Sequence, residues 1–180
     1  EQGQFKPYLQ PVFSVDTQKP VSVEMLVRWD HPEKGLIPPG QFIPLFERNG
    51  FITKLDFYIW ERACELLKQW KSENYLLPIS VNISRMDLYY TRLSEHLLAL
   101  VRRYDIDPSM LRLEITESAY SRDPDELVEI INRLRSLGFV ILMDDFGKRI
   151  EAHIPMNGWH AQEITPPDFV AKGLAILNHA

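Results

Sequence analysis

Apolar and polar residues along the chain repeat with two different periods, and stretches of the two kinds follow one another. Five stretches have the composition and alternation of β-strands, and they lie at residues 8–15, 21–29, 78–83, 111–117 and 139–146. Four stretches have helical spacing, and they lie at residues 39–48, 52–72, 93–104 and 124–137. The pattern therefore predicts strands that alternate with helices up to Gly147.

The helix predicted at residues 124–137 has the best-marked ends. Asp123 can cap its first turn, Pro124 suits the first helical position, and Gly138 is a natural stop. Its apolar residues fall on one face at helical spacing, and they are Leu127, Ile130, Ile131, Leu134 and Leu137. After Gly147 the pattern is lost, and only a short helix at residues 167–177 is predicted within a loop-like tail.

Strands that alternate with helices pair in parallel and carry the helices on the outside. Eight such units close a barrel, typically in about 250 residues, whereas residues 148–180 are too few to add three units to the five predicted strands. The short turn at residues 16–20 predicts that the first two strands form an antiparallel hairpin. The predicted fold class is α/β, an incomplete (β/α)8 TIM-like barrel with an antiparallel first strand.

Composition and charge narrow the class of protein. With 180 residues, 45% of them apolar and 25% charged, the chain has the size and make-up of one globular domain. Its net charge of -5 argues against a general DNA- or RNA-binding protein, which needs a concentrated basic surface. A nucleotide ligand stays open, because a metal ion can supply the positive charge.

The cellular setting is predicted from three further features. The single cysteine, Cys64, allows no internal disulfide, and its apolar neighbours predict a buried core thiol. No apolar run is long enough to span a bilayer and no signal peptide is recognisable, so we expect a cytoplasmic chain without a membrane segment. Because the sequence begins with Glu1, we expect it to be a piece of a longer protein.

Polar side chains interrupt four of the predicted strands. Alternation places Glu24, Asn82 and Glu114 on the face opposite the apolar side chains of their own strands. Because the apolar faces must pack against the outer helices, these three side chains are expected to point into the barrel. Asp144 and Asp145 lie on opposite faces of the fifth strand, at its carboxyl end. Barrel enzymes carry their active sites at that end.

Carboxylates that converge inside a fold need a partner, because an unpaired buried charge is strongly unfavourable. A divalent cation meets that need. The donors are all oxygen atoms, which suits magnesium or manganese, and Asp145 beside Asp144 is placed to help hold a second ion. Two such ions activate water and steady a leaving alkoxide, so the pattern favours phosphodiester hydrolysis. Any one of these carboxylates taken alone is better explained as a surface or salt-bridged group.

Short motifs occur in order between residues 8 and 147. They are Tyr8-Leu9-Gln10-Pro11-Val12, Val23-Glu24-Met25-Leu26-Val27-Arg28-Trp29, His31-Pro32, Gly35-Leu36-Ile37, Phe42-Ile43-Pro44-Leu45, Ser80-Val81-Asn82-Ile83-Ser84, Leu113-Glu114-Ile115-Thr116-Glu117-Ser118 and Asp144-Asp145-Phe146-Gly147. This series resembles the first part of the EAL domain, the bacterial family that hydrolyses cyclic di-GMP with divalent metal ions. The resemblance implies a modified barrel whose first strand runs antiparallel to the second.

The resemblance also implies a role for individual residues. Glu24, Asn82, Glu114 and Asp144 would bind one magnesium or manganese ion, and Asp144 and Asp145 would serve a second. Glu24, Asp144 and Asp145 are accordingly expected to be the catalytic residues.

Three further residues receive roles from the same resemblance. Arg28 would hold a substrate phosphate, Gln10 would contact the ligand, and Glu117 would brace the loop after Asp145. The family reaction opens cyclic di-GMP to linear pGpG. The resemblance leaves room for a homodimer and for GGDEF or sensor domains outside this chain.

The tail departs from the family pattern. Residues 148–151 follow Gly147 where the family has a small, serine-rich loop, and the lysine, glutamate and glutamine motifs of the family's second half are not found in residues 148–180. We therefore expect a partial EAL domain at residues 1–147 and a divergent tail at 148–180, produced by a frameshift or truncation or by true degeneration. Two functions follow as alternatives: a cyclic di-GMP phosphodiesterase, or a non-catalytic module that binds the dinucleotide or another protein. The missing motifs favour the second for this chain as it stands.

Overall fold

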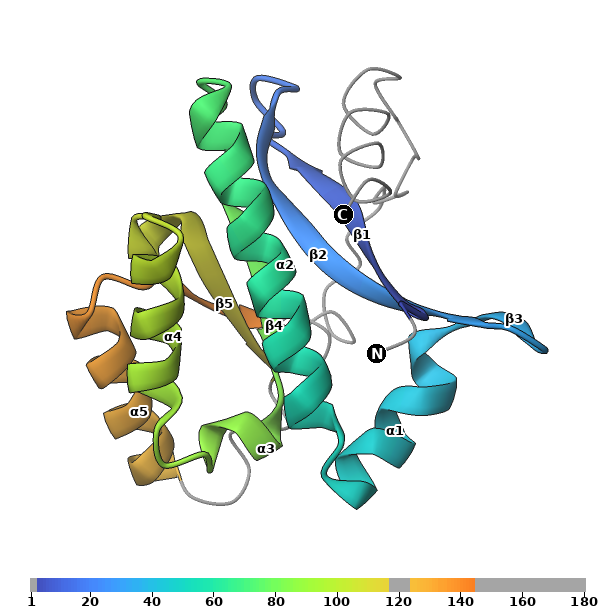
Figure 1. Cartoon of the computed structure of the whole chain (residues 1–180). Coiled ribbons are helices and arrows are strands. Elements are labelled where there is room, and N and C mark those ends of the chain that lie inside the picture. Colours follow the sequence, from blue (N-terminus) through green and yellow to red (C-terminus); the bar gives the residue numbers. More distant parts are fainter. Residues whose placement is uncertain (1–2, 117–123, 145–180) are drawn as a thin grey trace, which may run out of the picture.

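Strand pairing organises the part of the chain that the computed structural model describes, residues 3–116 and 124–144 (Figure 1). The strands are β1 (Phe5–Phe13), β2 (Pro20–His31), β3 (Gly35–Ile37), β4 (Ile79–Ile83), β5 (Leu111–Thr116) and β6 (Ile141–Asp144). Their order in the sheet is β1-β2-β4-β5-β6, and β3 pairs with β2 off this path. Among the described residues β1 and β6 do not pair, so the sheet is open, as an incomplete barrel requires.

The pairing directions agree with the predicted fold class. β1 and β2 form an antiparallel hairpin, whereas β2, β4, β5 and β6 are parallel to one another. β1 begins three residues before the predicted strand because Phe5 pairs with Trp29 and packs against its ring. Pro7 weakens the strand signal there. Proline cannot donate a backbone hydrogen bond to a neighbouring strand, but an edge strand such as β1 tolerates it where no such bond is needed.

Helices cover one side of this sheet (Figure 1). They are α1 (Pro39–Asn49), α2 (Ile52–Ser72), α3 (Arg85–Leu88), α4 (Leu93–Arg103) and α5 (Pro124–Ser136), with a 3-10 turn at Pro108–Met110. The four predicted helices are confirmed to within a residue. Gly138 follows α5 with a φ of 96°, which favours glycine and explains the stop. The short elements β3 and α3 were not predicted, because β3 forms by pairing with β2 and α3 is too short to show a helical repeat.

The apolar faces of the parallel strands form the core. Val23, Ile79, Val81, Leu111 and Leu113 are fully buried. They belong to one apolar cluster with the inner face of α2, whose fully buried members are Trp60, Ala63, Cys64 and Leu66. Burial raises the pKa of the Cys64 thiol to about 12, so it stays protonated at neutral pH. The predicted core thiol is confirmed. In the described part of the chain, no helix has both the length and the apolar character that crossing a membrane requires.

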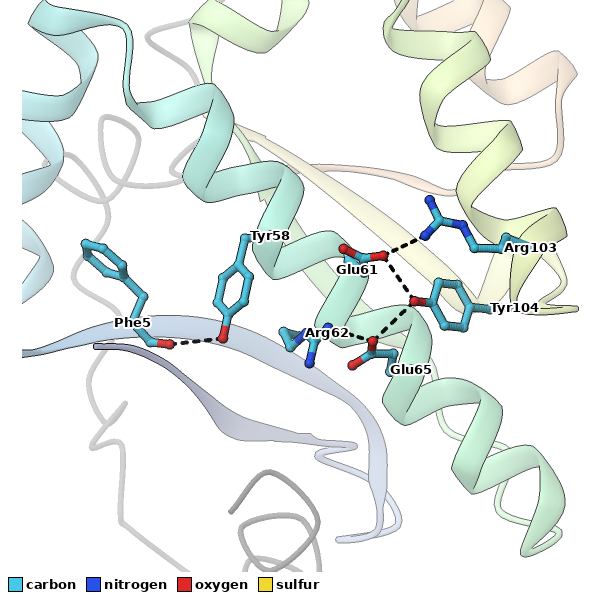
Figure 2. Close-up of polar contacts among 7 residues, drawn as sticks. All are labelled: Phe5, Tyr58, Glu61, Arg62, Glu65, Arg103 and Tyr104. Carbon is cyan, nitrogen blue, oxygen red and sulfur yellow. Dashed lines mark hydrogen bonds and ion pairs between the residues drawn. The ribbon is translucent and has the colours of Figure 1, made fainter. Parts of the chain in front are cut away.

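Polar side chains join α2 to its neighbours on the outer surface (Figure 2). The Tyr104 hydroxyl lies 3.1 Å from Glu61 Oε1 and 3.2 Å from Glu65 Oε1. Arg103 and Arg62 form ion pairs with these two carboxylates at 2.7 and 2.6 Å. Burial and the neighbouring carboxylates raise the pKa of Tyr104 to about 12, so its hydroxyl stays a donor. The cluster ties the end of α4 to the middle of α2.

Removing the central hydroxyl should weaken this connection. We expect Tyr104→Phe to lower the free energy of unfolding by about 1 kcal/mol, the ordinary contribution of one hydrogen bond. Urea denaturation measures this change, and Arg102→Ala is the control, because Arg102 is exposed on the same turn. A loss no larger than that of the control would show that the cluster does not stabilise the fold.

Candidate functional site

Three predicted site residues lie on one face of adjacent parallel strands. Asn82 in β4 pairs in register with Glu114 in β5, and Glu24 in β2 pairs with Ser80, two residues before Asn82. Residues paired across parallel strands point to the same face, and so do residues two apart on one strand. Glu24, Asn82 and Glu114 therefore share a face, opposite the buried apolar one. The prediction that these three side chains share one face of the sheet is confirmed.

The environment of these side chains suits ligand binding. Glu24, Asn82 and Glu114 are all half-buried, whereas their sequence neighbours Val81 and Leu113 are fully buried on the opposite face. Half-buried carboxylates keep access to an ion or substrate while they lose part of their hydration, which strengthens their electrostatic interactions. These side chains are therefore both accessible from the polar face and backed by the buried apolar face.

The two aspartates at the end of β6 are described only in part. Asp144 is the last residue of β6 and pairs in register with Thr116, two residues beyond Glu114. Its backbone thus ends next to the strand that carries Glu114. The side chain of Asp144 lies outside the described part, as do Asp145 and Glu117, and their predicted roles stay predictions. Asp123, the boundary at Gly147 and the helix predicted at residues 167–177 also lie outside the described residues.

The two predicted substrate contacts lie on the β1–β2 hairpin. Gln10 pairs directly with Glu24 across the antiparallel ladder, so the two side chains are neighbours on one face. Arg28 lies four residues beyond Glu24 on that face, with its Cζ 5.8 Å from the centre of the Tyr8 ring. One guanidinium N–H of Arg28 donates to the Val27 carbonyl at 2.9 Å. The hairpin therefore brings the Arg28 guanidinium and the Gln10 amide next to the face that carries Glu24, Asn82 and Glu114.

The donor set of the described residues fits a hard divalent ion. Carboxylate and amide oxygens are the ligands that magnesium and manganese prefer. The side chains of Glu24, Asn82 and Glu114 offer these oxygens at adjacent paired positions of the strands. Within residues 3–116 and 124–144, no three His, Cys, Asp or Glu side chains are grouped closely enough to hold a metal ion. Completion of the predicted ligand set depends on Asp144 and Asp145.

Arg112 adds a positive charge to the same face. Arg112 pairs in register with Ser80, which on its other side pairs with Glu24. It lies two residues before Glu114 on β5. Its Nε atom is buried and has no hydrogen-bond partner among the described residues. A guanidinium at this position offsets part of the repulsion between the carboxylates. Alternation along β5 placed Arg112 on the polar face, but nothing in the sequence assigned it a role.

A buried pair of carboxyl groups lies behind the segment that follows Asn82. Ser84 and Asp87 form a capping box at α3, in which the Ser84 backbone N–H and hydroxyl donate to Asp87 Oδ2 at 2.8 and 2.6 Å. Asp56 of α2 interacts with Asp87, and burial, the Asp87 charge and their hydrogen bond raise the pKa of Asp56 to about 9. The Asp56 carboxyl group is therefore protonated at neutral pH. Asp56 falls on the apolar side of α2, four residues after Ile52, and this spacing is the signal that could have identified it.

Comparison with known proteins is consistent with this arrangement. The family model described as EAL domain matches residues 1–160. The cyclic di-GMP phosphodiesterase PA2567 of Pseudomonas aeruginosa is 36% identical over 147 residues, which make up 82% of this chain and 25% of that protein. The bifunctional diguanylate cyclase/cyclic di-GMP phosphodiesterase MucR of the same organism is 34% identical over 165 residues, 91% of this chain and 24% of that protein.

Solved structures give the same likeness in three dimensions. The structure described as the PaMucR phosphodiesterase in complex with c-di-GMP matches with a TM-score of 0.77 at 34% identity. The match covers 80% of this chain and 59% of that chain. The chain spans about a quarter of the length of the two curated relatives.

Proposed function

The chain belongs to the EAL domain family, and from this premise we propose that it binds cyclic di-GMP and hydrolyses one of its phosphodiester bonds to give linear pGpG. The observation that carries the proposal is the shared, half-buried face of Glu24, Asn82 and Glu114 at the centre of the parallel sheet. Similarity to relatives named cyclic di-GMP phosphodiesterases supports the choice of substrate.

The proposed site needs magnesium or manganese. Glu24, Asn82, Glu114 and Asp144 would bind one ion, and Asp144 and Asp145 would bind a second. Such ions, when bound, lower the pKa of water and stabilise the leaving oxygen. The carboxylates contribute the negative charge that retains the ions, and the neutral amide of Asn82 adds a ligand without adding repulsion. Glu117 would brace the loop that carries Asp145.

Substrate binding is proposed for the β1–β2 hairpin. A guanidinium fork suits a phosphodiester, and Arg28 is held near the site by Tyr8 and by the Val27 carbonyl. Gln10, directly opposite Glu24, can donate to and accept from a nucleotide. These two residues would orient the dinucleotide so that its scissile phosphate faces the carboxylates.

A second function is supported by the tail. Residues 148–180 lack the lysine, glutamate and glutamine motifs that the family resemblance leads us to expect. If residues 1–147 are a partial domain and 148–180 a divergent tail, the chain would act as a non-catalytic module that binds cyclic di-GMP or a protein. In either case we expect it in the cytoplasm, as a homodimer or beside GGDEF or sensor domains. The bifunctional name of the relative MucR supports such neighbours.

Incubation of the purified chain with cyclic di-GMP and manganese separates the two functions. Chromatography of the products should show pGpG, and addition of a chelator should stop its formation. Binding of cyclic di-GMP without pGpG would favour the non-catalytic module. If the chain neither bound nor hydrolysed cyclic di-GMP, both the phosphodiesterase and the cyclic di-GMP-binding module would be contradicted.

A further inference from the structure

The backbone of β4 loses one of its two neighbours at the candidate metal ligand. β2 pairs with β4 only from Val23 with Ile79 to Met25 with Val81, whereas β5 stays paired with β4 as far as Ile83. Asn82 is therefore the first residue of β4 beyond the β2 ladder. A buried backbone group at such a point needs another hydrogen-bond partner.

Trp60 of α2 supplies that partner. Its indole Nε1–H donates to the backbone carbonyl of Asn82 at 3.0 Å. Helix α2 packs against β4 and β2 (Figure 1). Trp60 belongs to the buried core, so its indole approaches Asn82 from the side opposite the polar face. One aromatic side chain thus connects the buried helix with the residue whose amide faces the candidate site.

The indole itself is held firmly. Trp60 is fully buried, the ring of Phe57 lies 5.0 Å from it between centroids, and the His96 ring lies at 6.2 Å. His96 in turn stacks on Phe57 at 4.0 Å. A side chain packed on several sides cannot easily turn, so its N–H fixes the position of the carbonyl that it binds.

We propose that Trp60 is a positioning residue for Asn82, which it holds in register with Glu114 so that the amide oxygen is presented to a divalent ion. This inference rests on the proposed function, because it requires that Asn82 be a metal ligand. Groups that orient metal ligands commonly change metal affinity about 10- to 100-fold when they are removed. A backbone contact behind a neutral ligand belongs at the lower end of that range.

Trp60→Phe tests the role, because phenylalanine keeps an aromatic ring in the core but has no N–H. The matched control is Tyr58→Phe on the same helix, which removes a hydroxyl bonded to the Phe5 carbonyl in β1 at 3.3 Å (Figure 2). Manganese binding to the full chain is measured by calorimetry, with folding checked by circular dichroism. We expect about tenfold weaker binding for Trp60→Phe and no change for Tyr58→Phe.

A spectroscopic measurement on the wild-type chain keeps the test valid if Trp60→Phe does not fold. With 15N-labelled tryptophan, the Trp60 indole N–H should exchange slowly with solvent and should shift when magnesium is added. Unchanged manganese affinity in a folded Trp60→Phe chain, or an indole signal that magnesium leaves in place, would overturn the positioning role. Failure of the wild-type chain to bind manganese would instead overturn the proposed function, and the positioning role with it.

Discussion

Replacing Glu114 with glutamine should weaken manganese binding and cyclic di-GMP turnover by more than about a hundredfold, since removal of groups that only support a ligand already costs up to that much. Glutamine keeps the size of the side chain and one oxygen, but it removes the negative charge. Glu114 lies level with Asn82 at the centre of the parallel strands, so its charge is at the middle of the proposed ligand set. The loss should therefore be electrostatic, with little change in stability.

The matched control is Glu61→Gln, the same chemical change on the helical surface. Glu61 pairs with Arg103 and contacts Tyr104, on the side of α2 that faces α4. This variant should keep full manganese affinity and turnover. Calorimetry and product chromatography measure both quantities. If Glu114→Gln behaved like its control, Glu114 would have no part in metal binding. If the wild-type chain binds cyclic di-GMP without hydrolysing it, the manganese affinity of the two variants is the readout that tests the role of Glu114.

The free energy of unfolding should fall as the pH rises from 5 to 8, because of Asp56. Its pKa is about 9 in the folded chain, against a reference value of 3.8. Between these values the folded state holds one proton more than the unfolded state, so raising the pH favours unfolding. One proton corresponds to a slope of at most about 1.4 kcal/mol per pH unit. The stability contribution of the protonated Asp56 carboxyl is complete below its unfolded pKa and is lost as the pH approaches 9.

The groups around Asp56 define the test of this slope. Asp87 and Glu47 raise the pKa of Asp56 by their charge, and a hydrogen bond from Ser84 lowers it. Asp56→Asn keeps a hydrogen-bonding side chain without the titration, so its stability should depend less on pH and exceed that of the wild type at pH 8. Urea denaturation across pH 5–8 measures the difference. The exposed Asp105, paired with Lys71, provides the control Asp105→Asn, which should keep the wild-type slope. Parallel profiles for wild type and Asp56→Asn would contradict the raised pKa of Asp56.

Alternation along the strands was the strongest source of correct prediction. Each parallel strand has one face against the helices, so an apolar face and a polar face must separate in the sequence. This requirement alone is enough to place Glu24, Asn82 and Glu114 on a common face. It could not reveal which residues lie level with one another, because the register depends on the pairing of whole strands.

Contacts between distant elements could not be predicted. The indole of Trp60 and the carboxyl of Asp56 both lie on the buried side of α2, and helical periodicity shows only that they are buried. Which strand or loop they meet depends on how α2 crosses the sheet. The short helix α3 was missed for a different reason: its four residues are too few to show a helical repeat, although the capping box of Ser84 and Asp87 is a local signal of a helix start. The roles of Asp145, Glu117 and the tail remain predictions.

Manganese-induced broadening of backbone amide signals tests most directly whether Glu24, Asn82 and Glu114 bind one ion. A substoichiometric amount of manganese added to the 15N-labelled chain should broaden the amides of these three residues first, because paramagnetic relaxation falls steeply with distance. The amide of Glu73, at the far end of α2, should lose much less intensity. Broadening that is absent, uniform over the chain, or centred away from these strands would contradict a metal site on this face.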